Sequence, residues 1–266
     1  MINGTLFCRE MQGSVKLLLI FGAILTMYVA CMVALYDPAT VEMLDGFSKA
    51  MPELMAAVGM TPGASNLMGF LISYLYGFIL LVFPMVFCIL RGNGLIARYV
   101  DSGTMVYLVA APVKRRTVAL TQMAVLLCGI FLLISYTTAL EAALSQMLFP
   151  GELPLMELLR LNAGLLVLHI AIGGICFFAS CLFSEVKYSA LLGAGLPSLM
   201  YLFQMAANVG KGARDLRYAT LFTLFDPNGL ASAAQGALGK LAALLLISLL
   251  LYPAGIAVFS RKDFHI

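Results

Sequence analysis

Side chains that could carry out chemistry are few in this sequence and lie far apart. The 266-residue chain has two histidines, His169 inside an apolar run and His265 close to the C-terminus. A hydrolase or a catalytic metal centre needs His, Cys, Asp or Glu side chains that are grouped together. No such grouping is apparent, so we predict neither a catalytic triad nor a metal site, and we do not expect an enzyme.

The cysteines do not change this interpretation. All six fall in predicted membrane spans or on the predicted cytoplasmic side: Cys8, Cys31, Cys88, Cys128, Cys176 and Cys181. Cys176 and Cys181 could bind a metal or sense redox state, but a buried cysteine usually behaves as a small apolar side chain. We therefore expect no external disulfide.

Four polar side chains inside apolar runs are candidates for a translocation pathway: Gln122, His169, Gln204 and Asn208. Polar groups in a membrane segment are costly and often functional. For His169, a neutral ring that bonds a neighbouring helix is the favoured alternative. Because the polar residues are so sparse, a hydrophobic or amphipathic cargo, such as a peptide, a lipid or a drug-like molecule, suits the sequence best.

The composition identifies the elements that position these residues. Hydrophobic residues make up 62% of the chain and charged residues 11%, against about 45–50% and about 25% in soluble domains. Six runs reach the roughly 20 residues that a membrane-spanning helix needs. We predict an all-α polytopic membrane protein, a single transmembrane domain over 1–266. Its spans are predicted at about 17–36, 66–90, 117–140, 161–183, 188–210 and 241–260.

Charge predicts the orientation. Six spans place both termini on one side, and lysines and arginines are retained in the cytoplasm. With cytoplasmic termini in the cell membrane, the inside holds ten basic residues: Arg9, Lys16, Arg91, Arg98, Lys114, Arg115, Arg116, Lys187, Arg261 and Lys262. The external loop 211–240 disagrees, because it carries Lys211, Arg214 and Arg217. A net charge of +3 gives no indication of a nucleic-acid partner.

Outside the spans, three segments have helical signals. The first sixteen residues mix apolar and charged side chains, which is typical of an amphipathic helix at the membrane interface. Asp37-Pro38 and Asp226-Pro227 each predict a helix start, with Asp as N-cap and Pro in the first turn. Pro52 should kink or end the first of these external helices.

The segment from Arg91 to Arg116, between the second and third spans, is the most informative. An apolar stripe at Ile96, Val100, Tyr107 and Leu108 predicts a helix that lies on the membrane. Gly103 interrupts it and Pro112 stops it ahead of a basic cluster. Such a segment can present its polar side to a cytoplasmic partner; alternatively, it is an ordinary loop whose charges fix the topology.

The pattern Asp101-x-Gly103-Thr104, followed by Leu108-x-x-x-Pro112-Val113-x-Arg115, resembles the signature of ABC-2-type permeases, the membrane subunits of ATP-binding-cassette exporters. Motif-level similarity covers about 30 residues. The resemblance implies six spans with cytoplasmic termini and makes this segment a coupling helix that docks on an ATPase. The residues it implicates in coupling are Arg98, Asp101, Gly103, Thr104, Leu108, Pro112, Val113 and Arg115.

The same resemblance implies partners. Two cytoplasmic ATPase subunits would bind ATP and Mg²⁺, and a second permease chain, identical or homologous, would complete the pathway within the membrane lipids. This chain has no phosphate-binding loop of its own and so binds no cofactor. It departs from the family at Tyr99 and Val106, where members commonly have acids.

Two other functions compete with an exporter. An ion-coupled secondary carrier would need an acid inside the membrane, and the spans offer only Glu141, at an edge. A membrane sensor or assembly subunit could also dock a partner through residues 101–116, and only transport would distinguish it from an exporter.

Overall fold

The computed structural model describes residues 2–60, 66–104 and 113–262. Every regular element in these ranges is helical. Six helical runs there are long and apolar enough to cross a membrane, so the predicted all-α, multi-pass architecture is confirmed. These runs are α1 (Gly4–Ala34), α4 to α6 (Leu67–Asp101), α8 (Arg115–Leu148), α9 (Leu155–Leu182), α10 (Val186–Val209) and α12 (Gln235–Arg261).

The helices extend past the predicted spans. Helix α8 has 34 residues, or about 51 Å at 1.5 Å per residue, whereas the hydrocarbon core is about 30 Å thick. At the N-terminus, residues 4–16 form no separate element, because they belong to α1. Uncharged runs mark only the part of a helix that must avoid charge, and a helix continues past them as long as its backbone bonds and packing allow.

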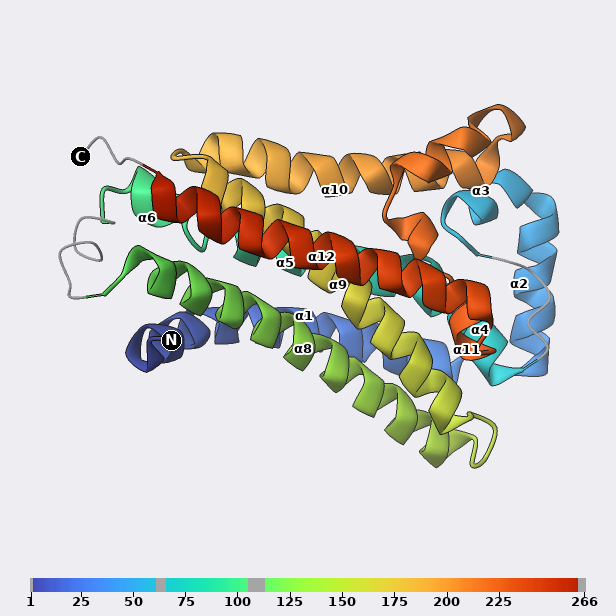
Figure 1. Cartoon of the computed structure of the whole chain (residues 1–266). Coiled ribbons are helices and arrows are strands. Elements are labelled where there is room, and N and C mark those ends of the chain that lie inside the picture. The colour runs from blue at the N-terminus through green and yellow to red at the C-terminus, as the bar shows by residue number, and fades with distance from the viewer. Residues whose placement is uncertain (1, 61–65, 105–112, 263–266) are drawn as a thin grey trace.

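The long helices run side by side, and the start of α1 and the end of α12 lie at the same end of the bundle (Figure 1). We call this the terminal end. The Nη1 atom of Arg115, in the first turn of α8, donates to the carbonyl of Lys262 over 2.7 Å, which ties the start of α8 to the end of α12 there. Helix α6 (Ala97–Asp101) also lies at the terminal end, while α2 (Pro38–Ala50), α3 (Pro52–Ala57) and α11 (Pro227–Ala231) lie at the opposite end (Figure 1).

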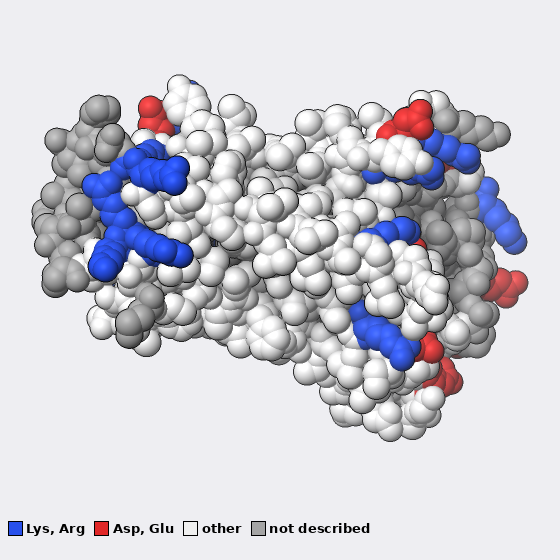
Figure 2. All heavy atoms as spheres, in the orientation of Figure 1, with Lys and Arg blue, Asp and Glu red and all other residues white. Residues whose placement is uncertain are grey.

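Charge follows the same division. On the face that Figure 2 shows, lysines and arginines gather at the terminal end with some acidic surface beside them, a wide uncharged band crosses the middle, and basic and acidic residues lie together at the opposite end. An uncharged band between two charged ends is what a bilayer requires of a protein surface.

Helix α9 forms the centre and packs against α5 (Leu80–Asn93), α8, α10 and α12. Small residues allow this close packing. A Cβ atom added at Gly92 of α5 would lie 2.5 Å from the Cβ of Cys176, and one at Gly173 would lie 3.0 Å from the Tyr252 hydroxyl. Gly174 and Gly193 also have close neighbours, but Gly195 faces open space.

At the opposite end, both Asp-Pro signals begin helices as predicted. Asp226 caps α11 by accepting from the Gly229 amide over 3.0 Å, whereas the side chain of Asp37 makes no capping bond to α2. The Lys240 ammonium, 2.8 Å from the Asp226 carboxylate, holds the pKa of that carboxyl below its usual value. Helix α2 ends before Pro52, which then begins α3.

Helix α3 and the residues after it rest on the second span through two glycines. This span contains a π-helical turn, η1 (Leu75–Ile79). Gly59, with φ of +74°, meets Gly77 so closely that a Cβ atom on Gly77 would lie 2.9 Å from the Gly59 carbonyl oxygen. The contact is between two backbones, which cannot rotate away as a side chain can.

Replacing Gly77 with alanine should therefore push α3 off the second span. We expect a loss of about 1–3 kcal/mol, typical of overpacking at a close contact. Thermal unfolding in detergent would measure it. Gly46→Ala, in open space on α2, is the control, and equal stability of the two variants would contradict the contact's importance.

Candidate functional site

The segment after the second span presents polar residues at the terminal end. Helix α6 ends at Asp101, and Gly103, with φ of +69°, turns the chain out of the helix, as predicted. Arg98, Asp101 and Thr104 are exposed, so their polar groups are available to a partner. Leu108 and Pro112 lie outside the described residues.

The opposite side of this segment is bonded to α1 through Glu10, which is 3% exposed. The Nη2 atom of Arg91 donates to Glu10 Oε2 over 2.7 Å and to the Glu10 carbonyl over 2.8 Å. The Tyr99 hydroxyl donates to the other carboxylate oxygen, Oε1. Tyr99, where the resembled family commonly has an acid, is thus a hydrogen-bond donor to the first span.

A serine joins the same segment to α9. The amides of Ile96 and Ala97 donate to the Ser180 hydroxyl oxygen over 3.1 and 3.0 Å. These amides open α6 and have no acceptor within the helix. Because Ser180 is fully buried in the central helix, residues 91–101 are held by both α1 and α9.

The two remaining candidate coupling residues that the structure describes are Val113, just before α8, and Arg115, at its start. Val113 packs against the hydrophobic core, and Arg115 bonds the end of α12. Neither is exposed like Asp101, so the structure separates the eight implicated residues into an exposed group, an anchored group and two undescribed positions.

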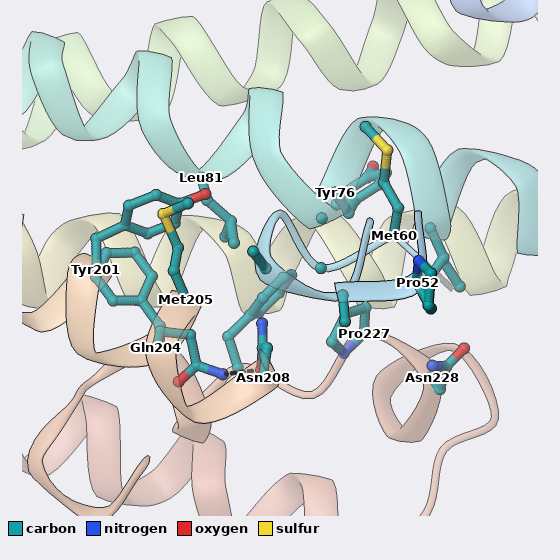
Figure 3. A pocket seen from close by; sticks show the side chains of 17 residues that line it. Pro52, Met60, Tyr76, Leu81, Tyr201, Gln204, Met205, Asn208, Pro227 and Asn228 are labelled. Atoms are coloured by element: carbon teal, nitrogen blue, oxygen red, sulfur yellow. Dashed lines mark hydrogen bonds between the residues drawn. The ribbon is translucent and has the colours of Figure 1, made fainter. Parts of the chain in front are cut away.

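Two of the four candidate pathway residues meet at the opposite end. Gln204 and Asn208 of α10 line a cavity of about 460 Å³, and the Gln204 amide donates to Asn208 Oδ1 over 3.2 Å. Figure 3 shows the Gln204 amide pointing toward Asn208 on one side of the cavity, with Tyr76 and Met60 on another side. The rest of its lining is mainly apolar and comes from α3 and the residues that follow it, the second span, α10 and residues 222–228.

The other two candidates lie elsewhere and are fully buried. His169 stands 2.9 Å from the carbonyl of Leu165 on its own helix and 3.2 Å from that of Leu81 on α5, which is the helix-bonding geometry favoured above. Gln122 lies beside Glu10, at the terminal end. Neither side chain lines the cavity.

The sequence predicts for Glu141 only a position at the edge of a span, but in the structure this acid is at the centre of a buried polar cluster. Glu141 is fully buried, and its Oε2 accepts from the Tyr76 hydroxyl at 2.7 Å and from the Asn162 amide at 3.1 Å. It lies about 36 Å along α8 from Thr117, one residue past the predicted span 117–140, and its side chain is inside the protein. A glutamate between Leu140 and Ala142, at the end of an uncharged run, is the signal that could have indicated it.

Tyr76 connects this acid to the cavity, since its ring lines the cavity and its hydroxyl bonds Glu141. Glu141 Oε1, Asn162 Oδ1 and the Ser145 hydroxyl have no hydrogen-bond partner among the described residues. These three residues do not line the cavity. The cavity can enclose an apolar molecule with a few hydrogen-bonding groups, because its own lining is mainly apolar and includes the amides of Gln204, Asn208 and Asn228. Among the described residues, no three His, Cys, Asp or Glu side chains form a metal-binding group.

Comparison with known proteins gives no match: no protein-family model and no curated protein is significantly similar to this chain.

Proposed function

We propose that this chain is the transmembrane permease subunit of an ATP-binding-cassette exporter of the ABC-2 type, with ATP hydrolysed by a separate subunit. The proposal rests on segment 91–104, one side of which is exposed while the other side is bonded to neighbouring helices. Arg98, Asp101 and Thr104 are exposed where a cytoplasmic ATPase would bind, while Glu10 and Ser180 hold the other side. A partner that displaces α6 therefore acts directly on three spans.

In this proposal the terminal end faces the cytoplasm of the cell. The basic residues gathered there support this orientation. Residues 4–16 of α1 act as the interfacial part of the first helix, and α6 acts as the coupling helix. Two ATPase subunits, each with ATP and Mg²⁺, and a second permease chain, identical or homologous, complete the transporter. Closure of the ATPase pair rocks the spans through segment 91–104.

The proposed cargo is hydrophobic or amphipathic. The lining of the 460 Å³ cavity supports this, because it combines Leu, Met and Phe side chains with the uncharged amides of Gln204 and Asn208. Hydrophobic peptides or lipids should stimulate the ATPase rate of the assembled complex. Stimulation by a small inorganic ion alone would contradict the cargo class.

Co-purification tests the function. The tagged chain is co-expressed with the ATPase encoded beside its gene, and ATP hydrolysis is measured with and without vanadate. A stable complex with vanadate-sensitive hydrolysis and transport into vesicles supports an exporter. The same complex without transport favours a sensor or assembly subunit, and a folded chain without any ATPase contradicts the proposal.

Two substitutions test the coupling segment. Asp101→Lys reverses an exposed charge, and Gly103→Pro is incompatible with a φ of +69°. Coupling free energies are about 1–3 kcal/mol, so we expect ATP-driven transport to fall by about 5–150-fold while insertion is unchanged. Glu185→Lys, an exposed reversal on the connection between α9 and α10, is the control, and Gly103→Asn should retain activity because Asn tolerates positive φ. Normal transport in both test variants would show that this segment does not couple ATP hydrolysis to transport.

Ion-coupled transport is a second candidate, favoured by the buried Glu141. A carboxyl group inside a membrane domain is what a proton- or sodium-coupled carrier needs. Transport that persists without any ATPase and requires an ion gradient would establish it.

A further inference from the structure

We propose that a groove between α8 and α12, near the terminal end, binds one anionic glycerophospholipid. In this arrangement the headgroup phosphate contacts Arg116 and Arg261, and an acyl chain lies along the groove. The groove has a volume of about 750 Å³, and its sides come from α8 and α12, with Ile170 of α9 at its base.

Two arginines give the groove one charged end. Arg116 stands in the first turn of α8 and Arg261 in the last turn of α12, and the bond from Arg115 to Lys262 brings these helix ends together. Both guanidinium groups are exposed, and neither has a hydrogen-bond or ion-pair partner among the described residues. The described lining contains no Asp or Glu. A planar guanidinium with free N–H groups is well suited to a phosphate.

The rest of the groove is apolar. Its two serines are satisfied within α12, because Ser248 donates to the Leu244 carbonyl over 2.9 Å and Ser260 donates to the Ile256 carbonyl over 2.6 Å. The Tyr252 hydroxyl likewise donates to the Ile170 carbonyl over 3.0 Å. An extended peptide in such a groove would leave its backbone groups without partners, whereas an acyl chain has none to satisfy.

Length also fits a lipid in one leaflet. The lining runs along α12 from Leu245 to Arg261, about 24 Å of helix. Half of a bilayer, headgroups included, is about 20–22 Å thick. With the arginines at headgroup level, the apolar part of the groove therefore covers the hydrocarbon of the same leaflet.

The test is a lipid titration of the delipidated, full-length chain in neutral detergent, followed by native mass spectrometry. Phosphatidylglycerol is compared with phosphatidylcholine of the same acyl chains and with glycerol phosphate, which has no tail. We expect one phosphatidylglycerol per chain, bound more tightly than either comparison ligand. Each basic residue near an anionic lipid contributes about fivefold in affinity, so Arg116→Gln with Arg261→Gln should weaken binding by about 30-fold.

Two further variants make the result specific. Lys16→Gln with Lys187→Gln removes two exposed charges from the same end but outside the groove, and it should bind phosphatidylglycerol normally. Ala257→Phe fills the groove from an exposed position on α12, and it should lose the lipid while the arginines remain. Melting temperatures equal to the wild type show that the variants are folded.

Three results would each overturn the proposal. Unchanged phosphatidylglycerol affinity in the double arginine variant would remove the headgroup contact. Equal affinity for glycerol phosphate would identify a site for a free anion. A wild-type dimer that dissociates in the Arg116 and Arg261 variant, without lipid loss, would assign the groove to a second copy of the chain.

Discussion

Replacing Glu10 with alanine is expected to lower the free energy of unfolding by about 3–5 kcal/mol, because it leaves the Arg91 charge buried without its counter-ion. Both side chains of the pair are under 10% exposed. The substitution also removes the acceptor of the Tyr99 hydroxyl. Three helical elements, α1, α5 and α6, therefore lose the carboxylate that they share, and only the bond from Arg91 to the backbone carbonyl of residue 10 remains.

The chain supplies its own reporter for this measurement. It contains no tryptophan, but Cys88, Cys176 and Cys181 are buried. Once the more accessible Cys8, Cys31 and Cys128 have been blocked, a thiol-reactive dye should label the three buried thiols only as the helices separate on heating. At about 2–4 °C per kcal/mol, Glu10→Ala should lower the melting temperature by at least 6 °C. Lys240→Gln, which breaks the more exposed pair with Asp226, should change stability by less than about 1 kcal/mol.

A double variant separates the charge from the packing. Glu10→Met with Arg91→Met replaces the buried pair with apolar side chains, which is often neutral or stabilising. We expect it to recover most of the stability but not the coupling of ATP hydrolysis to transport, because Tyr99 still lacks its acceptor on α1. A Glu10→Ala protein as stable as the wild type would show that the pair contributes nothing.

The second large effect is expected at Glu141. Glu141→Ala leaves the Tyr76 hydroxyl without its buried acceptor, at about 1–3 kcal/mol for an unsatisfied group. The Asn162 amide loses one of its acceptors but keeps the Tyr76 hydroxyl and the Leu158 carbonyl. Glu141→Gln keeps an acceptor oxygen and should cost less. Glu152→Gln, in an exposed loop, is the control, and the same dye-labelling measurement applies.

Glu141→Gln also separates the two candidate functions. In an ATP-driven exporter, the amide preserves the contact with Tyr76 and transport should continue. In an ion-coupled carrier, the loss of the ionisable group should abolish transport driven by the gradient. Abolished gradient-driven transport in a correctly folded variant would therefore overturn the exporter proposal.

The sequence by itself determined the class of fold. Charges cannot lie in hydrocarbon at low cost, so uncharged runs identify the six spans without tertiary information. Local signals were equally direct: Asp-Pro pairs began helices at Pro38 and Pro227, and Gly103 marked the end of α6. These features depend on the backbone chemistry of a few adjacent residues.

Only the tertiary structure decided which polar groups meet. Glu10, Arg91 and Tyr99 are up to 89 residues apart in the chain, and the sequence interpretation placed the first of them in a separate surface helix. The sequence places Glu141 at the end of a span, because its position along the helix follows from the length of the uncharged run. Its burial depends on Tyr76 and Asn162, which come from two other helices. The same holds for the four candidate pathway residues, of which only Gln204 and Asn208 line the cavity. Contacts between side chains of different helices follow from packing, and no local sequence pattern predicts them.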